Sequence, residues 1–330
     1  MKSYKLAIVG ATGLVGRTVL KVLEEKNLPN FTYELFSSKK SAGTTLKLLG
    51  KNYTVQELQD SSFDSNFDFA IFSAGANVSK HFVPIAASKN CIVIDNSSAF
   101  RMDDDVPLIV PEVNMSDAFN HKNIISNPNC STIQAVVVLK PLDDEFKIKR
   151  IVYSTYQAVS GSGKLGLLDL INKSSGKSLL KFSHPIYDNC LPHIDSFLIN
   201  RYTKEEMKLV NETRKILNKP KLQITATAVR VPVKNCHGES INIEFEKSFT
   251  LNDIFKVLKS APGVIIKDDL ENLIYPTAEI ANNHDEVFVG RIRRDFSLKN
   301  GINLWVVSDN LRKGAATNAV QIMENLIDGG

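Results

Sequence analysis

The sequence has few cysteines and no paired cysteine motif. Its 330 residues include four cysteines, Cys91, Cys130, Cys190 and Cys236, which lie far apart and form no CxxC pair. Zinc sites and disulfide-rich secreted folds depend on closely spaced cysteines, so this pattern argues against both classes. We therefore expect four free thiols and no metal site.

Long apolar runs and blocks of like charge are also missing. No stretch approaches the roughly 18 to 20 apolar residues of a membrane helix, and MKSYKLAIVGATG at the start has no signal-peptide core or cleavage site. Forty basic and 36 acidic residues give a net charge of +4 without a long run of either sign. This balance suits a small anionic ligand better than nucleic acid. We expect a cytoplasmic protein that binds small molecules, with no nucleic acid and no membrane.

The pattern of apolar residues predicts two domains, because the chain is longer than one typical core of roughly 100 to 200 residues. Near the N-terminus, apolar strands that close in small polar residues alternate with helical or irregular segments, as in a doubly wound parallel sheet. After Cys130, segments such as RIVYSTYQAVSG and ESINIEFEK alternate apolar and polar residues, as half-exposed antiparallel strands do.

The predicted fold class is therefore α/β, with two domains. Residues 1–129 are expected to form a Rossmann-like doubly wound parallel sheet that binds the cofactor. Residues 130–309 are expected to form an α+β catalytic and dimerisation domain with a mixed or antiparallel sheet. An amphipathic C-terminal helix over 310–330 is expected to pack back on the first domain.

A glycine loop between the first strand and helix predicts a nucleotide site. GATGLVG (10–16) has the spacing GxxGxxG, which lets backbone N–H groups at a helix start approach a pyrophosphate. A tight turn without a ligand is the alternative.

The end of the second strand bears on which nucleotide binds. A NAD site usually places an acid about 20 residues after the loop, but here the strand ends FSSKKSAG. Glu34 lies too early, within the strand. Hydroxyls and lysines fit a 2′-phosphate, so NADP(H) is the predicted cofactor, with a solvated basic turn as the alternative.

Cys130 is the candidate nucleophile. It stands in SNPNCSTIQAVVVLKPL, where Pro128 precedes an apolar run of helical length. Helix N-termini lower a thiol pKa, although small buried cysteines are also common at helix starts. His237 in VRVPVKNCHGES, seven residues after Arg230, is the candidate proton carrier. A nicotinamide fold with these two groups suggests an acylating aldehyde dehydrogenase that forms a thioester.

Eight segments then point to a known family. They are GATGLVG, SSKKSAG, NSSAFR, SNPNCSTIQ, YQAVSGSGKLG, YTKEEMKLVNETRKIL, VRVPVKNCHGES and DNLRKGAATNAVQI. Through them the chain resembles the aspartate-semialdehyde dehydrogenase family over nearly its whole length. The resemblance implies NADPH-dependent reduction of L-4-aspartyl phosphate to L-aspartate 4-semialdehyde and phosphate, in lysine, threonine and methionine biosynthesis.

The resemblance also implies roles for single residues. Cys130 matches the nucleophile, Gln157 the residue that orients the acyl group, and His237 the acid and base. Arg230 matches the residue that binds the substrate α-carboxylate, for which a guanidinium is suited. Glu205 matches the partner of the α-amino group, although Glu206 remains open as an alternative for that role.

Phosphate and cofactor contacts are implied in the same way. Arg101, Lys208 and Asn129 match phosphate-binding positions. The cofactor-binding positions are Thr12, Gly13, Leu14, Val15, Ser41, Ala42, Ser160, Gly161 and Asn310. Without the resemblance, Glu205 and Lys208 would be read as a surface pair on a helix and Gln157 as a partner for a backbone group. For Arg230 a cross-strand ion pair is the alternative.

Two rivals stay open on sequence alone. N-acetylglutamyl-phosphate reductase shares the fold plan and the cysteine chemistry, and a non-catalytic NADP-binding regulator could keep the fold.

Backbone N–H groups at the helix start near Cys130 are the expected donors to the oxyanion. The resemblance also suggests a homodimer or homotetramer.

Overall fold

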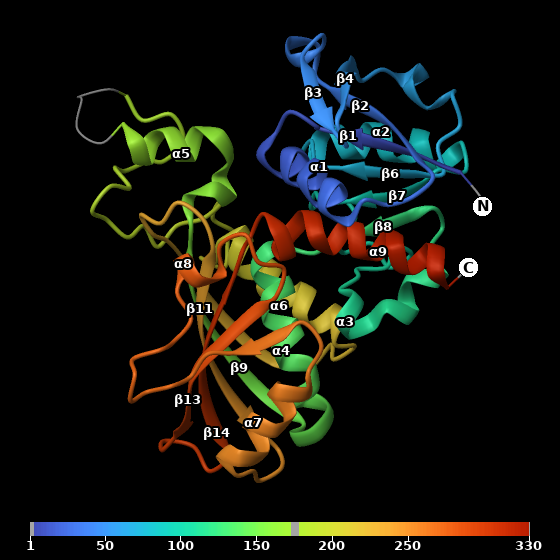
Figure 1. The fold of residues 1–330 in the computed structure, drawn as a ribbon. Coiled ribbons are helices and arrows are strands. Elements are labelled where there is room, and N and C mark those ends of the chain that lie inside the picture. The colour runs from blue at the N-terminus through green and yellow to red at the C-terminus, as the bar shows by residue number, and fades with distance from the viewer. Residues whose placement is uncertain (1–2, 173–177, 330) are drawn as a thin grey trace. The chain divides into compact units, whose positions relative to one another are not determined.

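The computed structural model describes residues 3–172 and 178–329. The chain divides into two compact units. Unit 1 contains Met1–Asn129 and Ala315–Gly330, and unit 2 contains Cys130–Gly314. Figure 1 draws the ribbon of both units, coloured along the chain.

Unit 1 is built on a six-stranded sheet in which every pair of neighbours is parallel. In sheet order the strands are β5 (Gln56–Glu57), β2 (Phe31–Ser37), β1 (Tyr4–Val9), β6 (Phe69–Phe72), β7 (Ile92–Asp95) and β8 (Ile124–Ser126). Central strands such as β6 are buried along their whole length, which is why they read as continuous apolar runs. The predicted doubly wound parallel sheet is confirmed.

The remaining elements of unit 1 surround this sheet. They are α1 (Leu14–Lys26), η1 (Lys39–Ser41), β3 (Thr45–Leu48), β4 (Lys51–Thr54), η2 (Asp60–Phe63), α2 (Ala76–Ser88), α3 (Pro111–Asn114), η3 (Met115–Asn120) and α9 (Thr317–Asp328).

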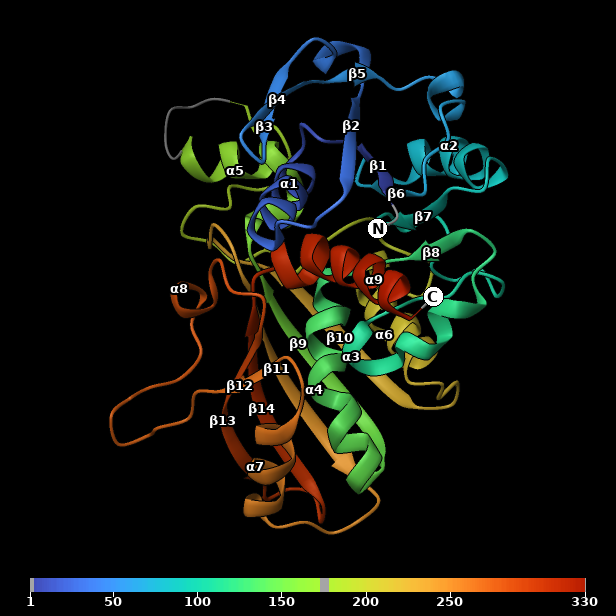
Figure 2. The ribbon, with the colours of Figure 1, turned by 45° about the vertical axis from the view of Figure 1, so that its right-hand side comes forward.

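The C-terminal helix α9 belongs to the core of unit 1. Its buried Val320 and Met323 lie in the same apolar cluster as Ile8 of β1 and Val19 of α1, and Figure 2 shows α9 in red near α1 in blue. The regular helix begins at Thr317 and not at residue 310, because Arg312–Ala316 form a π-helical turn.

Unit 2 contains a six-stranded mixed sheet. In sheet order the strands are β10 (Gln223–Arg230), β9 (Ile148–Gln157), β11 (His237–Phe245), β14 (Gly301–Ser308), β13 (Val287–Asp295) and β12 (Val264–Ile266). The three inner pairings are antiparallel and the two outer ones are parallel. The predicted mixed or antiparallel sheet is therefore confirmed as mixed.

Helices cover one face of this sheet. They are α4 (Cys130–Phe146), α6 (Lys204–Ile216) and α7 (Leu251–Ser260), and Figure 1 shows α4 and α7 in front of the strands. Shorter elements complete the unit: η4 (Val159–Ser162), α5 (Gly163–Ile171), α8 (Ala278–Ala281) and the π-helical turn.

The alternation of side chains along a strand decides which residues of unit 2 face the helices. On β9, Tyr153, Thr155 and Gln157 are buried on one side, while Tyr156 is 41% exposed on the other. Polar residues at inward positions therefore lie beneath α4 and α6.

No helix among the described residues is long and apolar enough to cross a membrane.

Candidate active site

Cys130 is the first residue of α4, as the apolar run after it predicted. Its thiol is partly exposed, and no acidic residue lies in the first turn. The first N–H groups of a helix have no intrahelical partner and carry the positive end of the dipole. The position therefore favours a negatively charged sulfur.

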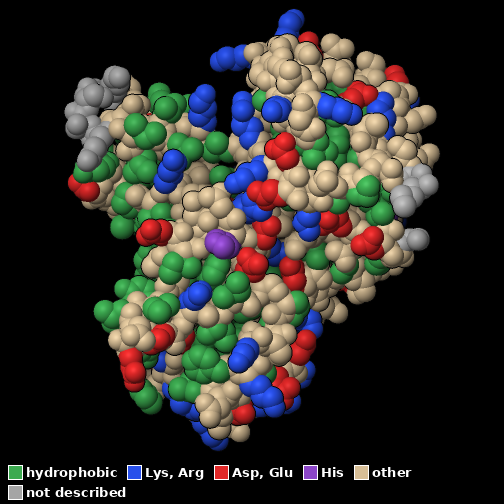
Figure 3. All heavy atoms as spheres, viewed as in Figure 1, with side chains coloured by type: hydrophobic (Ala, Val, Ile, Leu, Met, Phe, Trp, Pro, Cys, Tyr) green, Lys and Arg blue, Asp and Glu red, His purple; other side chains and the backbone are tan. Residues whose placement is uncertain are grey.

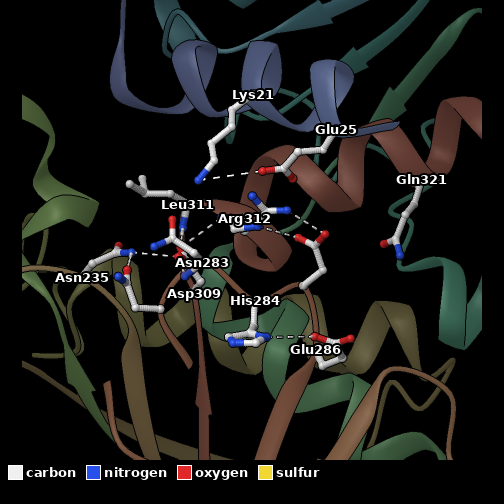
Figure 4. Close-up of polar contacts among 12 residues, drawn as sticks. Lys21, Glu25, Asn235, Asn283, His284, Glu286, Asp309, Leu311, Arg312 and Gln321 are labelled. Carbon is white, nitrogen blue, oxygen red and sulfur yellow. Dashed lines mark hydrogen bonds and ion pairs between the residues drawn. The ribbon is translucent and has the colours of Figure 1, made fainter. Parts of the chain in front are cut away.

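His237 opens β11, and the preceding turn is held by two side chains. Cys236 has φ of 73°, an uncommon backbone conformation for a residue with a side chain. Its N–H donates to Asn310 Oδ1 at 2.9 Å, and Asp309 Oδ2 accepts from Asn235 Nδ2 at 2.9 Å, as Figure 4 shows. These contacts fix the position at which His237 enters the strand.

The imidazole of His237 is fully buried. Its Nδ1 accepts a hydrogen bond from the Ala158 N–H at 3.0 Å, so the proton of the neutral ring lies on Nε2. Burial, and next the charge of Arg230, lower the pKa of His237 to about 3. Among the described residues Nε2 has no hydrogen-bond partner, and it is therefore a donor available to a bound oxygen atom.

Arg230 ends β10 and is 4% exposed. Its Nη1 donates to the Ala158 carbonyl at 2.6 Å, while Nε has no hydrogen-bond partner in the described part of the chain. Burial lowers the pKa of Arg230, and the charges of Glu205 and Cys130 oppose that shift. A guanidinium remains charged even so, which leaves a buried cation with donor capacity for a carboxylate.

The structure separates Glu205 from Glu206. Glu206 accepts from the N–H groups of Thr203 at 2.7 Å and Ala228 at 3.0 Å, one at each oxygen. It completes the capping box of α6. Glu205 instead accepts from Gln157 Nε2 at 3.2 Å and Lys208 Nζ at 3.0 Å.

Lys208 is held between two carboxylates. It contacts Glu205 and Asp195, each at 3.0 Å. Burial acts to lower the pKa of Lys208, but Glu205 and Asp195 outweigh it and raise the pKa to about 12. The pair with Glu205 is thus largely buried and differs from an exposed ion pair on a helix surface.

Gln157 joins this group from the sheet. It is 1% exposed, and its Nε2 donates to Thr155 Oγ1 at 3.3 Å as well as to Glu205. The side chain amide is therefore directed by other side chains rather than by a backbone group.

Gly161 lies against two of these residues. A Cβ atom at Gly161 would be 3.1 Å from Arg230 Nη1 and 3.3 Å from His237 Nε2, so both side chains face the same small space. Ser160 Oγ contacts the Asn310 side chain at 3.0 Å. The predicted cofactor residues Ser160, Gly161 and Asn310 therefore lie around His237 in unit 2.

The other predicted cofactor residues lie in unit 1. Thr12 and Gly13 are in the turn between β1 and α1, Leu14 and Val15 begin α1, and Ser41 and Ala42 end the turn at η1. No acidic residue occupies the first turn of α1, and Gly13 offers no side-chain cap. The backbone N–H groups of this turn therefore fit the pyrophosphate of a dinucleotide.

Two observations on β2 bear on the nucleotide. Glu34 forms an ion pair with Lys5 at 2.6 Å, so its carboxylate is engaged within the sheet. Lys39 and Lys40, which follow the strand, are exposed. This end of β2 presents cations and hydroxyls rather than an acid.

The predicted phosphate residues divide between the units. Arg101 is buried in unit 1, where it donates to the carbonyls of Asn127 at 2.9 Å and Asn96 at 2.8 Å. Asn129 is also buried and is the last residue before unit 2. Lys208 lies in unit 2, on α6.

Two acids of unit 2 were not predicted from the sequence. Asp195 pairs with Lys208, and its loop position gave no signal. Glu239 is fully buried on β11, two residues after His237. The alternation of side chains along the strand could have predicted this position, because it places Glu239 on the same side as His237. No group of metal-binding side chains occurs among the residues that the structure describes.

Comparisons with known proteins agree with this arrangement. Residues 5–121 match the family model "Semialdehyde dehydrogenase, NAD binding domain", and residues 139–313 match "Semialdehyde dehydrogenase, dimerisation domain". The first match confirms the predicted nicotinamide dinucleotide.

Similar proteins cover the whole chain. An aspartate-semialdehyde dehydrogenase of Aquifex aeolicus is 52% identical over 99% of both chains, and one of Bacillus subtilis is 47% identical over 98% of both. A crystal structure of aspartate semialdehyde dehydrogenase II of Vibrio cholerae, complexed with ASA, has a TM-score of 0.95 and 44% identity and covers 99% of both chains. The chain therefore belongs to the aspartate-semialdehyde dehydrogenase family, as the eight segments of its sequence predicted.

Proposed function

We propose that this chain catalyses the NADPH-dependent reduction of L-4-aspartyl phosphate to L-aspartate 4-semialdehyde and phosphate, on the route to lysine, threonine and methionine. The observation that carries the proposal is the buried Glu205, held between Gln157 and Lys208 in the unit that also contains Arg230, His237 and Cys130. This unit therefore holds a buried cation and a buried anion, and an amino acid carries a charge complementary to each.

Arg230 and Glu205 are the proposed contacts for the amino-acid end of the substrate. The guanidinium of Arg230 binds the α-carboxylate, since its Nε has no hydrogen-bond partner among the described residues and its Nη1 lies beside Gly161. Glu205 binds the α-amino group, because Glu206 already spends both oxygens on backbone N–H groups. A plain aldehyde would offer no carboxylate to Arg230 and no amine to Glu205, so the site favours an amino acid.

Cys130 is the proposed nucleophile. Its sulfur forms a bond to the acyl carbon, the bond to the phosphate oxygen breaks, and inorganic phosphate leaves with the electron pair. The oxyanion that forms meanwhile accepts hydrogen bonds from N–H groups at the start of α4 and from Nε2–H of His237. Gln157 orients the acyl group.

The cofactor supplies a hydride to the thioester carbon when it is bound. The carbon–sulfur bond then breaks and the semialdehyde leaves. His237 donates from Nε2 to the oxygen during this step. To take up a proton at Nε2 in the reverse direction, the ring must carry its hydrogen on Nδ1, so the contact with the Ala158 N–H must open.

Phosphate and nucleotide contacts complete the proposal. Arg101, Lys208 and Asn129 bind the leaving phosphate. Lys39 and Lys40 favour the 2′-phosphate of NADP over the ribose hydroxyl of NAD, since Glu34 is paired with Lys5. A related structure from Candida albicans is titled as a complex with NADP, with 25% identity and a TM-score of 0.79.

The working form is proposed to be a homodimer through the face of the unit 2 sheet that α4, α6 and α7 leave open. That face has a hollow of about 530 Å³ lined by residues that include Tyr156, Tyr275 and Trp305. Figure 3 shows further hydrophobic side chains in green at the surface of this unit, where Figure 1 draws the orange loop before β13. Exposed apolar surface of this extent is typical of an interface, and the matching family model is named for dimerisation.

The oligomeric state tests this last part. Light scattering during gel filtration should give twice the chain mass, and Tyr156→Asp should shift the population to monomer. Lys149→Asp, on the same strand but at the exposed ion pair with Glu244, is the control and should remain dimeric. A wild-type monomer at all concentrations would remove the dimer from the proposal.

The reaction is tested in reverse, as reduction of NADP by L-aspartate semialdehyde in the presence of phosphate. The rate should depend on phosphate and should be lower with NAD. N-acetylglutamate semialdehyde should give little turnover, because its acylated amine offers Glu205 no positive charge. Turnover with N-acetylglutamate semialdehyde but not with L-aspartate semialdehyde would contradict the proposal.

The cellular location is proposed to be the cytoplasm. The four free thiols suit a reducing compartment.

A further inference from the structure

Glu239 is a buried acid with no role in the proposed reaction. It has 0% exposed surface in the middle of the unit 2 sheet. Neither carboxyl oxygen accepts a hydrogen bond of ordinary distance and angle from another described residue. None of the ion pairs within the described ranges includes Glu239. A carboxylate in such a place is unfavourable, because its surroundings replace little of its hydration.

The strand register places Glu239 directly beneath the candidate active site. Along β11, His237 and Glu239 point to the same side, toward the helices. Glu239 lies opposite Thr155 on β9, and Gln157 donates to that same threonine. Glu239 is therefore one step further into the core than His237 and Gln157.

The helix above Glu239 is α4, which starts at Cys130. Gln134 of α4 donates to the His237 carbonyl at 3.3 Å, which ties the first turns of the helix to β11. The Ser131 hydroxyl is fully buried and acts directly on the Glu239 carboxyl. Ser131 follows the candidate nucleophile in sequence, so a contact at Ser131 fixes the turn that carries the thiol.

The charges around Glu239 also favour its neutral form. Burial is the main cause that raises the pKa of Glu239 well above its usual value, the Ser131 hydroxyl opposes the rise, and the charge of Glu205 adds to it. The titratable groups that interact with Glu239 are Tyr153 on β9 and Glu205 on α6, His237 lies on the same side of β11, and β14 contributes Val306 opposite Glu239. His237 is neutral, Tyr153 is a buried phenol and Glu205 is an anion, so none of them stabilises a second negative charge.

We propose that Glu239 is a positioning residue for Cys130: its carboxyl group stays uncharged and donates its O–H to the Ser131 hydroxyl. This contact holds the first turn of α4 without placing a negative charge next to the thiolate. The inference rests on the proposed function in one respect, namely that Cys130 is the nucleophile. It makes the acid a neutral hydrogen-bond donor rather than a proton carrier.

Infrared spectroscopy tests the charge without any substrate. A difference spectrum at neutral pH between wild type and Glu239→Gln should show loss of a protonated carboxyl band. The buried Asp95 also has a raised pKa, but it is present in both proteins and cancels in the difference. Loss of a carboxylate band instead would overturn the proposal.

Kinetics and alkylation test the positioning. Glu239→Gln keeps a neutral donor of the same size, so its kcat should stay within about threefold of wild type. Glu239→Ala should lower kcat about tenfold or more while the KM for semialdehyde changes less than about threefold. The iodoacetamide reaction of Cys130, followed on its peptide by mass spectrometry, should keep its pH profile in Glu239→Gln and shift it in Glu239→Ala.

Two further variants keep the test decisive. Glu244→Gln is the matched control, since Glu244 is on the same strand but pairs with Lys149 at 2.7 Å on the exposed side, and it should change nothing. If Glu239→Ala does not fold, Ser131→Ala removes the acceptor instead and should slow alkylation of Cys130. An unchanged alkylation profile in the folded alanine variant, or a tenfold loss of kcat in Glu239→Gln, would overturn the proposal.

The outcomes separate this inference from the proposed function. A wild-type protein without dehydrogenase activity that still shows the infrared and alkylation results would contradict the function alone. An active wild type whose Glu239→Gln variant loses activity would contradict the role of Glu239 alone.

Discussion

The two units build their binding groups from different parts of the chain. In unit 1 the candidate cofactor contacts are backbone N–H groups of the turn before α1 and exposed lysines after β2. In unit 2 the candidate substrate contacts are buried side chains, with Glu205 5%, Arg230 4% and His237 0% exposed. Exposed charges contribute little, about 0 to 1 kcal/mol per pair, whereas a buried charge that loses its partner costs several times more. Substitutions in unit 1 should therefore give graded changes in affinity, and those in unit 2 large changes in rate and pH dependence.

The largest effect is expected at Cys130. Cys130→Ser should lower kcat by about a thousandfold or more, because a hydroxyl at this position is a far weaker nucleophile than a thiolate. The measurement is phosphate-dependent NADP reduction by L-aspartate semialdehyde. Cys190→Ser, at the exposed thiol, serves as the control and should keep wild-type turnover. Full activity in Cys130→Ser would rule out the thioester route.

The neighbouring acids of α6 should differ strongly from each other. Glu205→Gln should lower kcat/KM by about a hundredfold, since the half-buried Lys208 and the substrate amine both lose a charged partner. Glu206→Gln should keep kcat/KM within about threefold but should lower the free energy of unfolding by about 1 kcal/mol through the weakened cap. Steady-state kinetics and urea unfolding of both variants measure the contrast. Equal kinetic losses would show that the capping box does not separate their roles.

His237 should make the stability of the protein depend on acid. Its pKa in the folded protein, about 3, is below the ordinary value of 6.5. The neutral ring therefore contributes stability above pH 6.5, and this contribution falls as the pH drops from 6.5 toward 3, because only the unfolded chain takes up the proton. The slope is at most about 1.4 kcal/mol per pH unit.

The variant His237→Gln lacks this term. Urea unfolding at several pH values across that window should show wild type losing its advantage over His237→Gln as the pH falls. A constant difference between the two proteins would mean that the ring binds its proton equally well in both states.

The smallest effect is expected at the exposed lysines of unit 1. Replacing Lys39 and Lys40 by alanine should raise the KM for NADP by about tenfold and leave the KM for NAD unchanged. Lys51→Ala, on β4 of the same unit, is the control for net charge. If both cofactors lose affinity equally, the lysines act on charge in general and not on the 2′-phosphate.

Local patterns were enough for much of the fold. The apolar runs of unit 1 and the alternating strands of unit 2 predicted a parallel and a mixed sheet, because burial on two faces or on one face leaves different patterns. The run after Cys130 predicted a helix that begins at that residue. The start of α9 was not visible, because Asp309 accepts from the N–H groups of Leu311 and Arg312 and a π-helical turn precedes the regular helix.

The candidate site needed more than local patterns. Glu205 and Glu206 have the same chemistry and adjacent positions, and only the contacts with Gln157 and Ala228, from other strands, distinguish them. Glu239 in HGESINIEF resembles any acid of a half-exposed strand. It is buried because α4 lies across that face of β11, and a helix distant in sequence leaves no trace in the strand itself.

The sequence by itself determined the family, the classes of the two sheets and the residue types needed for acyl chemistry on a thiol, since these depend on local periodicity and on motifs of fixed spacing. Only the tertiary structure decided which of the two acids caps α6, which ring nitrogen of His237 holds the proton, and that Glu239 is buried beneath α4. Burial and hydrogen bonding set the charge of a side chain, and both arise from contacts between segments far apart in the chain.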